Sequence, residues 1–296
     1  MITKLVDDPN QSDLINFLIK SVQLEQDQEY KERKKNQSVV SDMNLSDLLE
    51  DAPLVYKKNK LKDQTIVKET TEIIPIVIGQ SFEQFFLKYF PPGEYQREVP
   101  INFEVKGDFG NWLISGRADL VQYLGMKDDR FSDKDIIIRD WKSTSAFQME
   151  TVLREIRVFK KNGKLPKHKY FWQLQAYRYG FEQKGYSVKD LSLLIYCRHW
   201  THRKSLEINN YPKSEFFEEP LPLIPKQIIE NYLFEKCTQH QEMDMGQQEE
   251  GATEPLCSEE TRWFRGKVSM RCGLYCDVGK SGLCNQYNRE LNQNAE

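Results

Sequence analysis

No cysteine precedes Cys197 in this chain, and no long apolar run occurs anywhere in it. A helix needs about 18 consecutive apolar residues to span a bilayer, and the opening residues lead into acidic and amidic sequence rather than a signal-peptide core. A large charge imbalance is also lacking, since 42 basic and 45 acidic residues give a net charge of −3. We therefore expect a soluble, cytoplasmic protein without membrane contacts, which could bind nucleic acid only through a local basic patch.

The apolar pattern predicts an α/β core with less regular additions. The expected elements are a helix at 81–89, strands at 97–106, 112–123 and 134–142, a helix at 170–185, strands at 192–197 and 203–208, and a helix near 226–236. This order indicates a mixed sheet flanked by helices. The expected segments are a helical N-terminal extension (1–65), the core (66–210), a helix with an acidic linker that is mobile at 239–254 (211–255), and a cysteine-containing segment (256–296).

Two acidic residues and a lysine lie on neighbouring predicted strands. Asp140 and Lys142 follow an isoleucine run, and their spacing of two places them on one face of a strand. Trp141 should point the other way, toward the core, with its carbonyl free to bind a metal. An antiparallel hairpin could bring Asp119 beside Asp140, and such carboxylates bind Mg²⁺ while a lysine orients water or stabilises charge. The alternative is a simple Asp140–Lys142 ion pair at a strand edge.

Three motifs occur in a fixed order between residues 75 and 200: Gly116-Arg117-Ala118-Asp119, then Asp140-Trp141-Lys142-Ser143-Thr144, then Gln173-Leu174-Gln175-Ala176-Tyr177. This set resembles the RecB-like, phage exonuclease-like branch of the PD-(D/E)XK nuclease superfamily. The resemblance implies a restriction-endonuclease-like core, with a mixed central sheet flanked by helices and additions at both ends. It also implies Mg²⁺ or Mn²⁺ on Asp119, Asp140 and the Trp141 carbonyl, with Lys142 serving the water. Gln173 and Tyr177 would support the lysine or touch DNA.

The resemblance also assigns Glu83, four residues after Gly79, to the same metal, directly or through water. Each assignment has an alternative. Glu83 could face solvent on an amphipathic helix, Tyr177 could belong to the core, and Gln173 could be an ordinary helix residue.

A basic belt extends from Arg154 to Lys204, where thirteen Lys or Arg stand against three Asp or Glu. Such a belt near the predicted site favours sequence-independent, salt-sensitive contacts with DNA phosphates, whereas a solvated loop is the alternative. The aromatic run 170–172 could stack on unpaired bases, although burial in the core is the favoured reading. The expected DNA-binding residues are Lys160, Lys161, Lys164, Lys167 and Lys169.

Four cysteines crowd the C-terminal segment: Cys257, Cys272, Cys276 and Cys284. Four thiolates suit Zn²⁺ or an iron–sulfur cluster, and several nucleases of the resembling branch carry a [4Fe–4S] cluster. Their pattern has one cysteine before the first motif, which this chain lacks, so the fourth ligand would be Cys257 or Cys237. Free thiols in a packed tail are the alternative.

The predicted function is a Mg²⁺- or Mn²⁺-dependent deoxyribonuclease, an exonuclease of recombination, repair or DNA end-processing in a bacterial cell or encoded by a phage. Its substrate would be double- or single-stranded DNA of any sequence, and its partner a recombinase, a single-strand annealing protein or a helicase. The alternatives are a non-catalytic DNA-binding scaffold with the same fold and a restriction-type endonuclease.

Overall fold

The computed structural model describes residues 2–6, 28, 43–60, 65–69, 90, 93–126, 128, 131–209, 211–246, 255–262, 264–265, 268–269, 271–272, 276–280 and 284–293. The chain divides into two compact units. The sheet unit comprises 41–49 and 79–237, and the cysteine unit comprises 1–40, 50–78 and 238–296. These boundaries fall at other residues than those expected from the sequence. The predicted helix at 81–89, with Glu83, lies outside the described residues.

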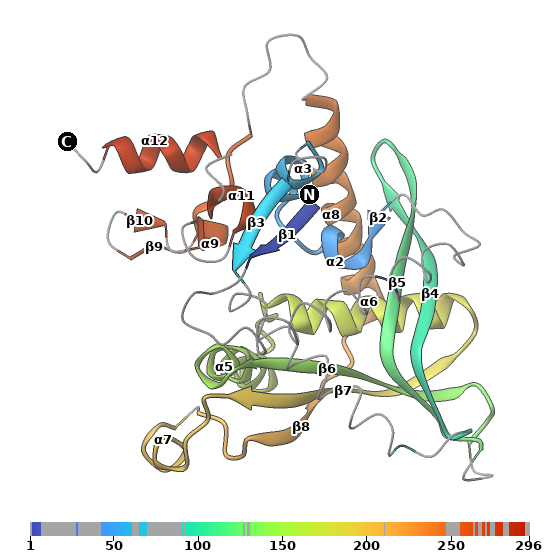
Figure 1. Cartoon of the computed structure of the whole chain (residues 1–296). Coiled ribbons are helices and arrows are strands. Elements are labelled where there is room, and N and C mark those ends of the chain that lie inside the picture. Colours follow the sequence, from blue (N-terminus) through green and yellow to red (C-terminus); the bar gives the residue numbers. More distant parts are fainter. Residues whose placement is uncertain are drawn as a thin grey trace. The chain divides into compact units, whose positions relative to one another are not determined.

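The sheet unit is built on a six-stranded mixed sheet flanked by helices, as predicted (Figure 1). Its strands are β2 (Met43–Asn44), β4 (Tyr95–Gly107), β5 (Gly110–Tyr123), β6 (Asp135–Ser145), β7 (Ser187–Arg198) and β8 (Phe216–Leu221). The order is β2-β5-β6-β7-β8, with β4 also on β5. The pairs β4–β5, β5–β6 and β7–β8 are antiparallel, and β2–β5 and β6–β7 are parallel. The four predicted strands up to residue 197 are thereby confirmed.

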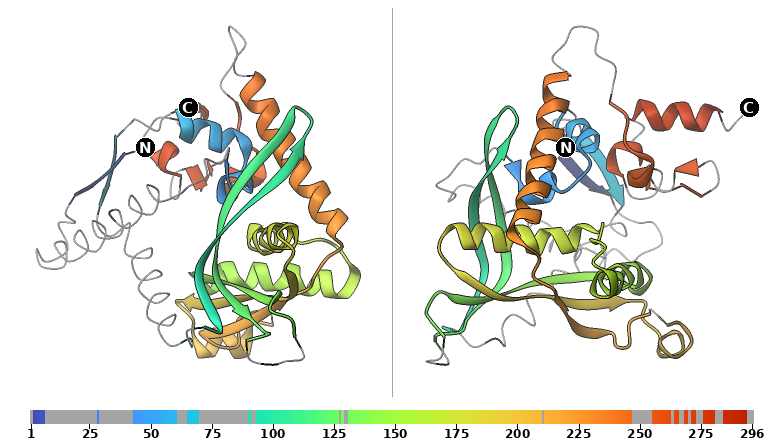
Figure 2. Two further views of the ribbon diagram at one scale, coloured as in Figure 1. Left: turned by 90° about the vertical axis from the view of Figure 1, so that its right-hand side faces the viewer. Right: turned by 180° about the vertical axis from the view of Figure 1, so that it is seen from behind.

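One edge of β5 is shared between two strands. There β2 pairs with β5 as far as Ser115, and β6 pairs with it only from Leu120 onward. The other edge pairs with β4 along its length, so β4 and β5 form a ribbon that curves away from β6–β8 (Figure 2). Because β6 in turn loses β5 after Arg139, the sheet opens beside Asp119 and Asp140.

Two helices cross over between the parallel strands β6 and β7: α5 (Ala146–Asn162) and α6 (Lys169–Gln183). The sequence predicted α6 but not α5, whose residues were assigned only to the basic belt. The Ser145 hydroxyl caps α5 by accepting the Gln148 N–H at 3.1 Å, and Gly163 ends it at φ 74°, a conformation that glycine adopts without strain. Its buried residues lie at helical spacing: Ala146, Met149, Val152, Leu153 and Ile156.

Helix α6 is buried on most sides and carries the aromatic run of the predicted base-stacking surface. Phe171 and Trp172 are only 1% and 4% exposed, so they belong to the core and cannot stack on bases. Trp172 stacks on Tyr232 of α8 (Lys226–Gly246), with ring centroids 3.6 Å apart. Gly180 permits the close packing of α6 on β4, because a Cβ there would lie 2.6 Å from the Phe103 ring.

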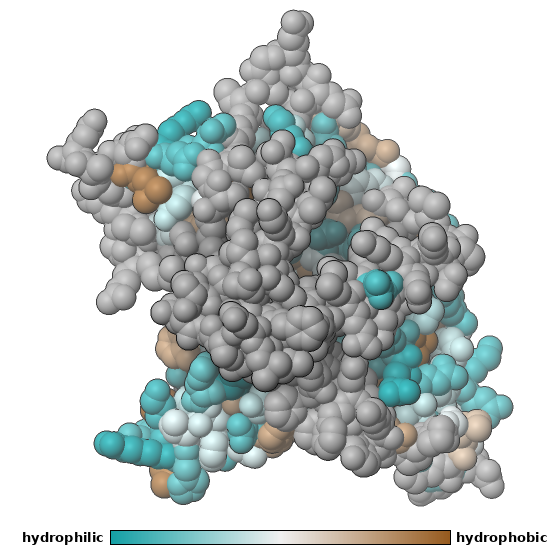
Figure 3. All heavy atoms as spheres, in the orientation of Figure 1, coloured by the Kyte–Doolittle hydropathy of each residue, from teal (hydrophilic) through white to brown (hydrophobic). Residues whose placement is uncertain are grey.

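The segment 203–208 is helical rather than the predicted strand, as part of α7 (His202–Glu207). Arg203 and Glu207 form an i,i+4 ion pair, and Ser205 alone is buried, so the segment has no apolar face to place in a sheet. The surrounding side chains are mostly hydrophilic at the lower left of Figure 3. Strand β8, which was not expected from the sequence, pairs with β7 instead, and its Pro220 is tolerated because β8 is an edge strand.

Helix α8 confirms the helix predicted near 226–236 but continues to Gly246. The first part of the expected mobile linker at 239–254 is therefore helical, and residues 247–254 lie outside the described part. Glutamine, glutamate and methionine are good helix formers, and His240 and Gln241 are buried at 3% and 6% exposure.

The cysteine unit contains small elements from both halves of the chain. They are β1 (Ile2–Val6), α3 (Ala52–Lys60), β3 (Thr65–Glu69), α9 (Glu259–Arg262), β9 (Phe264–Arg265), β10 (Val268–Ser269), α11 (Asp277–Lys280) and α12 (Asn285–Gln293). β1 and β3 pair in parallel, and β9 and β10 pair antiparallel. No helix in the described part of either unit is long and apolar enough to cross a bilayer.

Candidate active site

The carboxylate of Asp119 bridges β5 and β6 where their backbone pairing ends. Its Oδ2 accepts the backbone N–H of Trp141 at 2.7 Å, two residues beyond Arg139, the last residue of β6 that pairs with β5 in the ladder. The predicted antiparallel hairpin is thereby confirmed, and Asp119 lies against the stretch of β6 that holds Asp140 and Lys142.

Asp140 is fully buried and forms an ion pair with Lys142, whose side chain is 15% exposed. Its second carboxylate oxygen, Oδ1, is buried without a hydrogen-bond partner among the described residues. A buried charge with an unsatisfied oxygen is costly unless a further cation or donor reaches it. The donor set therefore fits the divalent cation that the resemblance implies.

Lys142 lies close to both carboxylates. Burial alone would lower the pKa of Lys142, but Asp140 and Asp119 together raise it above its ordinary value. The ammonium also lies 5.1 Å from the centre of the Tyr170 ring, which adds a cation–π contact. The lysine is thus held as a cation between two carboxylates and an aromatic face.

Gln173 and Tyr177 come to the same place from α6. The Gln173 amide donates to the Tyr177 hydroxyl at 3.1 Å. Burial raises the pKa of Tyr177 above its ordinary value, and the negative charges of Asp140 and Asp119 raise it further, so the phenol stays neutral. At 4% exposure Tyr177 is a core residue, as the alternative interpretation expected, and its role in supporting Lys142 or contacting DNA stays a prediction.

The glycine of the first motif is required by this packing. A Cβ at Gly116 would lie 2.8 Å from Cε1 of Tyr177. The motif Gly-Arg-x-Asp thus serves two purposes, because its glycine makes room for Tyr177 and its aspartate reaches β6.

Five of the predicted residues are brought together: Asp119, Asp140, Lys142, Gln173 and Tyr177. Trp141 differs from its expectation, because it is half-buried whereas Asp140 is the fully buried neighbour. The reason is that Asp140 shares the face of β6 on which Tyr177 of α6 lies. Glu83 lies outside the described residues, and no three His, Cys, Asp or Glu side chains within the described part are arranged to hold one metal ion.

His168, which was not predicted as a site residue, caps α6 beside Lys142. Its Nδ1 accepts the Tyr170 N–H at 3.3 Å, and Glu155 of α5 accepts the N–H of His168 at 2.9 Å. Burial lowers the pKa of His168 to about 4; Glu155 opposes the shift, and Lys169 and Lys142 add to it. Histidine is not among the preferred N-cap residues, so no sequence signal pointed to it.

The five lysines predicted to bind DNA lie at the end of α5, in its connection to α6 and at the first residue of α6. Lys161, Lys164, Lys167 and Lys169 are exposed. Lys160 is engaged within the protein, because its ammonium bonds Glu219 at 3.0 Å and the Pro220 carbonyl at 3.2 Å. Two of the exposed lysines, Lys167 and Lys169, flank His168 directly in the chain.

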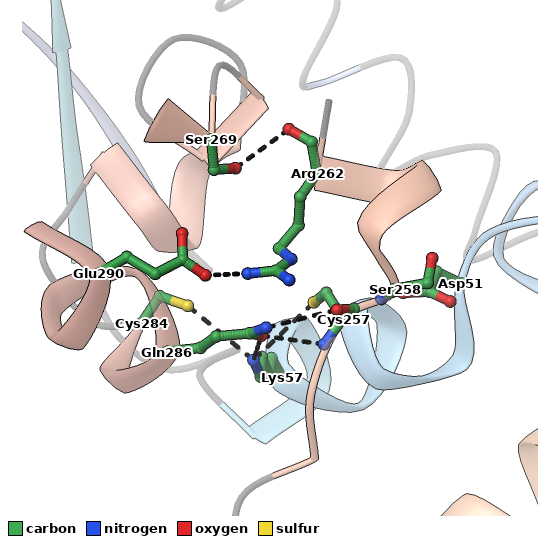
Figure 4. A network of polar contacts seen from close by, with 9 residues as sticks. All are labelled: Asp51, Lys57, Cys257, Ser258, Arg262, Ser269, Cys284, Gln286 and Glu290. Atoms are coloured by element: carbon green, nitrogen blue, oxygen red, sulfur yellow. Dashed lines mark hydrogen bonds and ion pairs between the residues drawn. The ribbon is translucent and has the colours of Figure 1, made fainter. Parts of the chain in front are cut away.

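The four C-terminal cysteines form a second candidate site, inside the cysteine unit, with Cys257 and Cys284 drawn in Figure 4. Burial raises the pKa of Cys257 to about 11, Lys57 lowers it, and the Cys284 and Cys272 thiols add to the rise. Burial likewise raises the pKa of Cys272, and Cys276 and Cys284 raise it further. Cys257, Cys272 and Cys284 thus act on one another, Cys276 acts on Cys272, and all four thiols are free.

Two other cysteines belong to the sheet unit. Cys197 and Cys237 are both fully buried in its hydrophobic core. Burial raises the pKa of each thiol to about 12, as expected for inert core cysteines. Cys257 rather than Cys237 thus lies with the other tail thiols, as one of the two predicted options.

Comparison with known proteins adds little to this geometry. No protein-family model matches the chain, and no curated protein is similar enough to count as a match. Among solved structures, one described as "Crystal structure of SSO0001" aligns over 94% of this chain and 98% of its own, with 14% identity and a TM-score of 0.49. At that level of similarity the match carries no conclusion about function.

Proposed function

We propose that the protein is a metal-dependent deoxyribonuclease with a PD-(D/E)XK core, whose active site lies where β5 and β6 separate. One observation carries the proposal. Among the described residues, the buried Asp140 carboxylate has an oxygen without a hydrogen-bond partner, beside Asp119 and Lys142. A carboxylate placed only for stability would have its oxygens satisfied by the protein.

Mg²⁺ or Mn²⁺ would be held by Asp119 and Asp140, with the Trp141 carbonyl and Glu83 as the further ligands that the resemblance supplies. Such a cation, when bound, activates a water and neutralises charge on the phosphate. Hard oxygen donors of this kind suit these metals, which keep several of their own waters.

Lys142 serves the water beside the metal. Its ammonium, which pairs with Asp140, can donate hydrogen bonds to the attacking water or to a phosphate oxygen. Tyr170 confines the ammonium from one side. The Gln173–Tyr177 pair fills the space behind the carboxylates and presents a neutral hydroxyl to them.

DNA would be held through its phosphates by the exposed lysines of the α5–α6 connection, without base recognition. The exonuclease subtype, the role in recombination or repair, and a recombinase, annealing protein or helicase as partner follow from the resemblance. We further propose that the four tail thiols bind a thiophilic metal, an iron–sulfur cluster or Zn²⁺, that holds the cysteine unit together.

The test uses end-labelled linear DNA and closed circular DNA, with and without Mn²⁺. Asp140→Asn and Lys142→Met should each lower the rate by about 100-fold or more, the usual loss when a group that stabilises the transition state is removed. Asp190→Asn changes an exposed carboxylate on β7 and should retain wild-type activity.

Degradation of linear DNA alone, lost in both site variants, supports the exonuclease. Cleavage of circles would make the protein an endonuclease with the same site. DNA binding that chelators leave unchanged, without any Mn²⁺-dependent product, would refute the catalytic proposal in favour of a binding protein.

A further inference from the structure

Lys57 is a lysine with almost no exposure to solvent. It lies on α3 and is 3% exposed, which is rare for lysine unless the ammonium is paired. Its Nζ lies 3.8 Å from the Cys257 sulfur and 3.9 Å from the Cys284 sulfur, although 200 and 227 residues separate it from them. Figure 4 shows the side chain reaching from α3 toward both thiols.

One glutamine fixes the geometry around this lysine. Oε1 of Gln286 accepts from the Lys57 ammonium at 3.3 Å and from the Cys257 N–H at 2.9 Å, while its Nε2 donates to the Cys257 carbonyl at 3.3 Å. Since Gln286 stands two residues after Cys284, these bonds hold both thiol-bearing segments to the same ammonium.

The segment around α3 contacts the cysteine-bearing segments at two further points. Asp51 accepts the N–H of Ser258, the residue after Cys257, at 3.3 Å. Glu50 binds the guanidinium of Arg271, the residue before Cys272, at 2.8 Å. Residues 50–57 therefore contact the segments that carry Cys257, Cys272 and Cys284. Among the described contacts of residues 50–57, Lys57 supplies the cation that lies next to sulfur.

The thiol site is also tightly packed. A Cβ at Gly279 of α11 would lie 2.3 Å from the carbonyl oxygen of Cys272. Any side chain at position 279 would displace the Cys272 segment. The segment that carries Cys272 is therefore packed closely against α11.

We infer that Lys57 is a positioning residue of a thiolate-bound metal centre, where its ammonium donates N–H···S bonds and offsets the negative charge of the ligands. Thiolate is the form of cysteine that binds metal, and a nearby cation favours it. Four thiolates leave either Zn²⁺ or an iron–sulfur cluster with net negative charge, which is costly to bury without a counter-charge. The inference rests on the proposed thiol-bound metal and is independent of the nuclease activity.

The experiment compares the full-length wild type with Lys57→Met, Lys57→Arg and Lys60→Met, purified without oxygen. Iron and zinc per chain and visible absorbance identify the metal, and its release into a chelator gives a rate. Lys57→Met should release metal about tenfold faster or more, the usual effect of removing a partner of metal ligands. Lys57→Arg should restore much of the retention because it keeps the charge. Lys60→Met, an exposed lysine on the same helix, should match the wild type.

If the metal is an iron–sulfur cluster, its reduction potential should become more negative in Lys57→Met, since charge and N–H···S bonds set that potential. A merely structural role would not shift it. Circular dichroism of each variant guards against misfolding. Equal release from Lys57→Met and wild type, or equal damage from Met and Arg, would overturn the inference. So would a wild-type protein that contains neither metal, and none of these results bears on the nuclease assay.

Discussion

Tyr177 occupies its place in the candidate site only because residue 116 has no side chain. The 2.8 Å between a hypothetical Cβ at Gly116 and the Tyr177 ring leaves no room for a methyl group unless one of them moves. Asp140 illustrates the opposite case, a side chain whose buried oxygen lacks a partner in the described protein. The close contact at Gly116 and the unpaired oxygen of Asp140 both belong to the candidate site around Tyr177.

Gly116→Ala should lower the free energy of unfolding by about 1–3 kcal/mol, the usual cost of an added methyl in a packed core. Urea unfolding followed by tryptophan fluorescence measures this cost. The control is a double-mutant cycle with Tyr177→Leu, which removes the ring that the new methyl meets. Additive effects in that cycle would show that the two positions do not clash.

The start of α6 is the element on which the site depends, because this helix carries Gln173 and Tyr177. Its cap is the Nδ1 of His168, which accepts the Tyr170 N–H only while that nitrogen is unprotonated. Burial keeps the pKa of His168 near 4, below its ordinary value of 6.5. Protonation of His168 therefore breaks the capping hydrogen bond and places a positive charge on a buried ring, and both effects lower the free energy of unfolding.

Stability should consequently fall as the pH drops from 6.5 toward 4. Between pH 6.5 and 4 His168 is protonated in the unfolded chain but not in the folded chain. The full contribution of the neutral His168 to folding stability is therefore present only above pH 6.5. The loss from this residue should reach about 2 kcal/mol at pH 5. His168→Asn retains a capping side chain but does not titrate, so its stability should change less between pH 7 and 5. Parallel pH profiles for variant and wild type would contradict this assignment.

The elements that could be predicted from the sequence are those with a strong local pattern. Strands β4 to β7 and helix α6 show apolar runs bounded by turn residues, and the three motifs fixed which of them should meet. Helix α5 was not predicted because its basic residues were interpreted only as part of the basic belt. The sequence does contain signals for both helix ends, since Ser145 and Gln148 form a capping-box sequence and Gly163 is a typical helix C-terminus. Segment 203–208 was predicted as a strand but is helical, and β8 was not predicted at all. Pairing at the edge of a sheet depends on tertiary context rather than on local propensity.

The candidate site was predictable in its carboxylates, lysine, glutamine and tyrosine, because these are tied to motifs. Three features were not. The opening of the sheet at residues 119 and 140 depends on where β2 and β6 meet β5. The His168 cap and the approach of Lys57 to the thiols depend on contacts between residues far apart in the chain, for which a single sequence holds no signal.

The whole molecule is made of two units that the chain enters repeatedly, since residues 41–49 and 79–237 form one and the remaining segments form the other. The hydrophobic core cluster that contains the β-sheet residues lies wholly in the sheet unit. Four of the five tryptophans, at positions 112, 141, 172 and 200, also fall there. Fluorescence thus reports mainly on that unit.

Leu54→Ala and Leu193→Ala should separate the unfolding of the two units. Both leucines are buried, at 2% and 0% exposure, in the cysteine unit and the sheet unit respectively. Each change should cost about 2–5 kcal/mol. Calorimetry should show two transitions, with the fluorescence midpoint moved by Leu193→Ala and much less by Leu54→Ala. Equal shifts of a single transition would mean that the units unfold together.

The division of the cysteine unit between distant chain segments sets an order of biosynthesis. All segments of the sheet unit have been translated by residue 237, while the four tail thiols lie beyond it, and Cys257 follows Lys57 by 200 residues. The strands that carry Asp119 and Asp140 can therefore pair before the cysteine segment is translated, whereas the Cys257 and Cys284 thiols can meet α3 only afterwards. A truncation after residue 237 would thus keep every segment of the sheet unit and remove all four tail thiols.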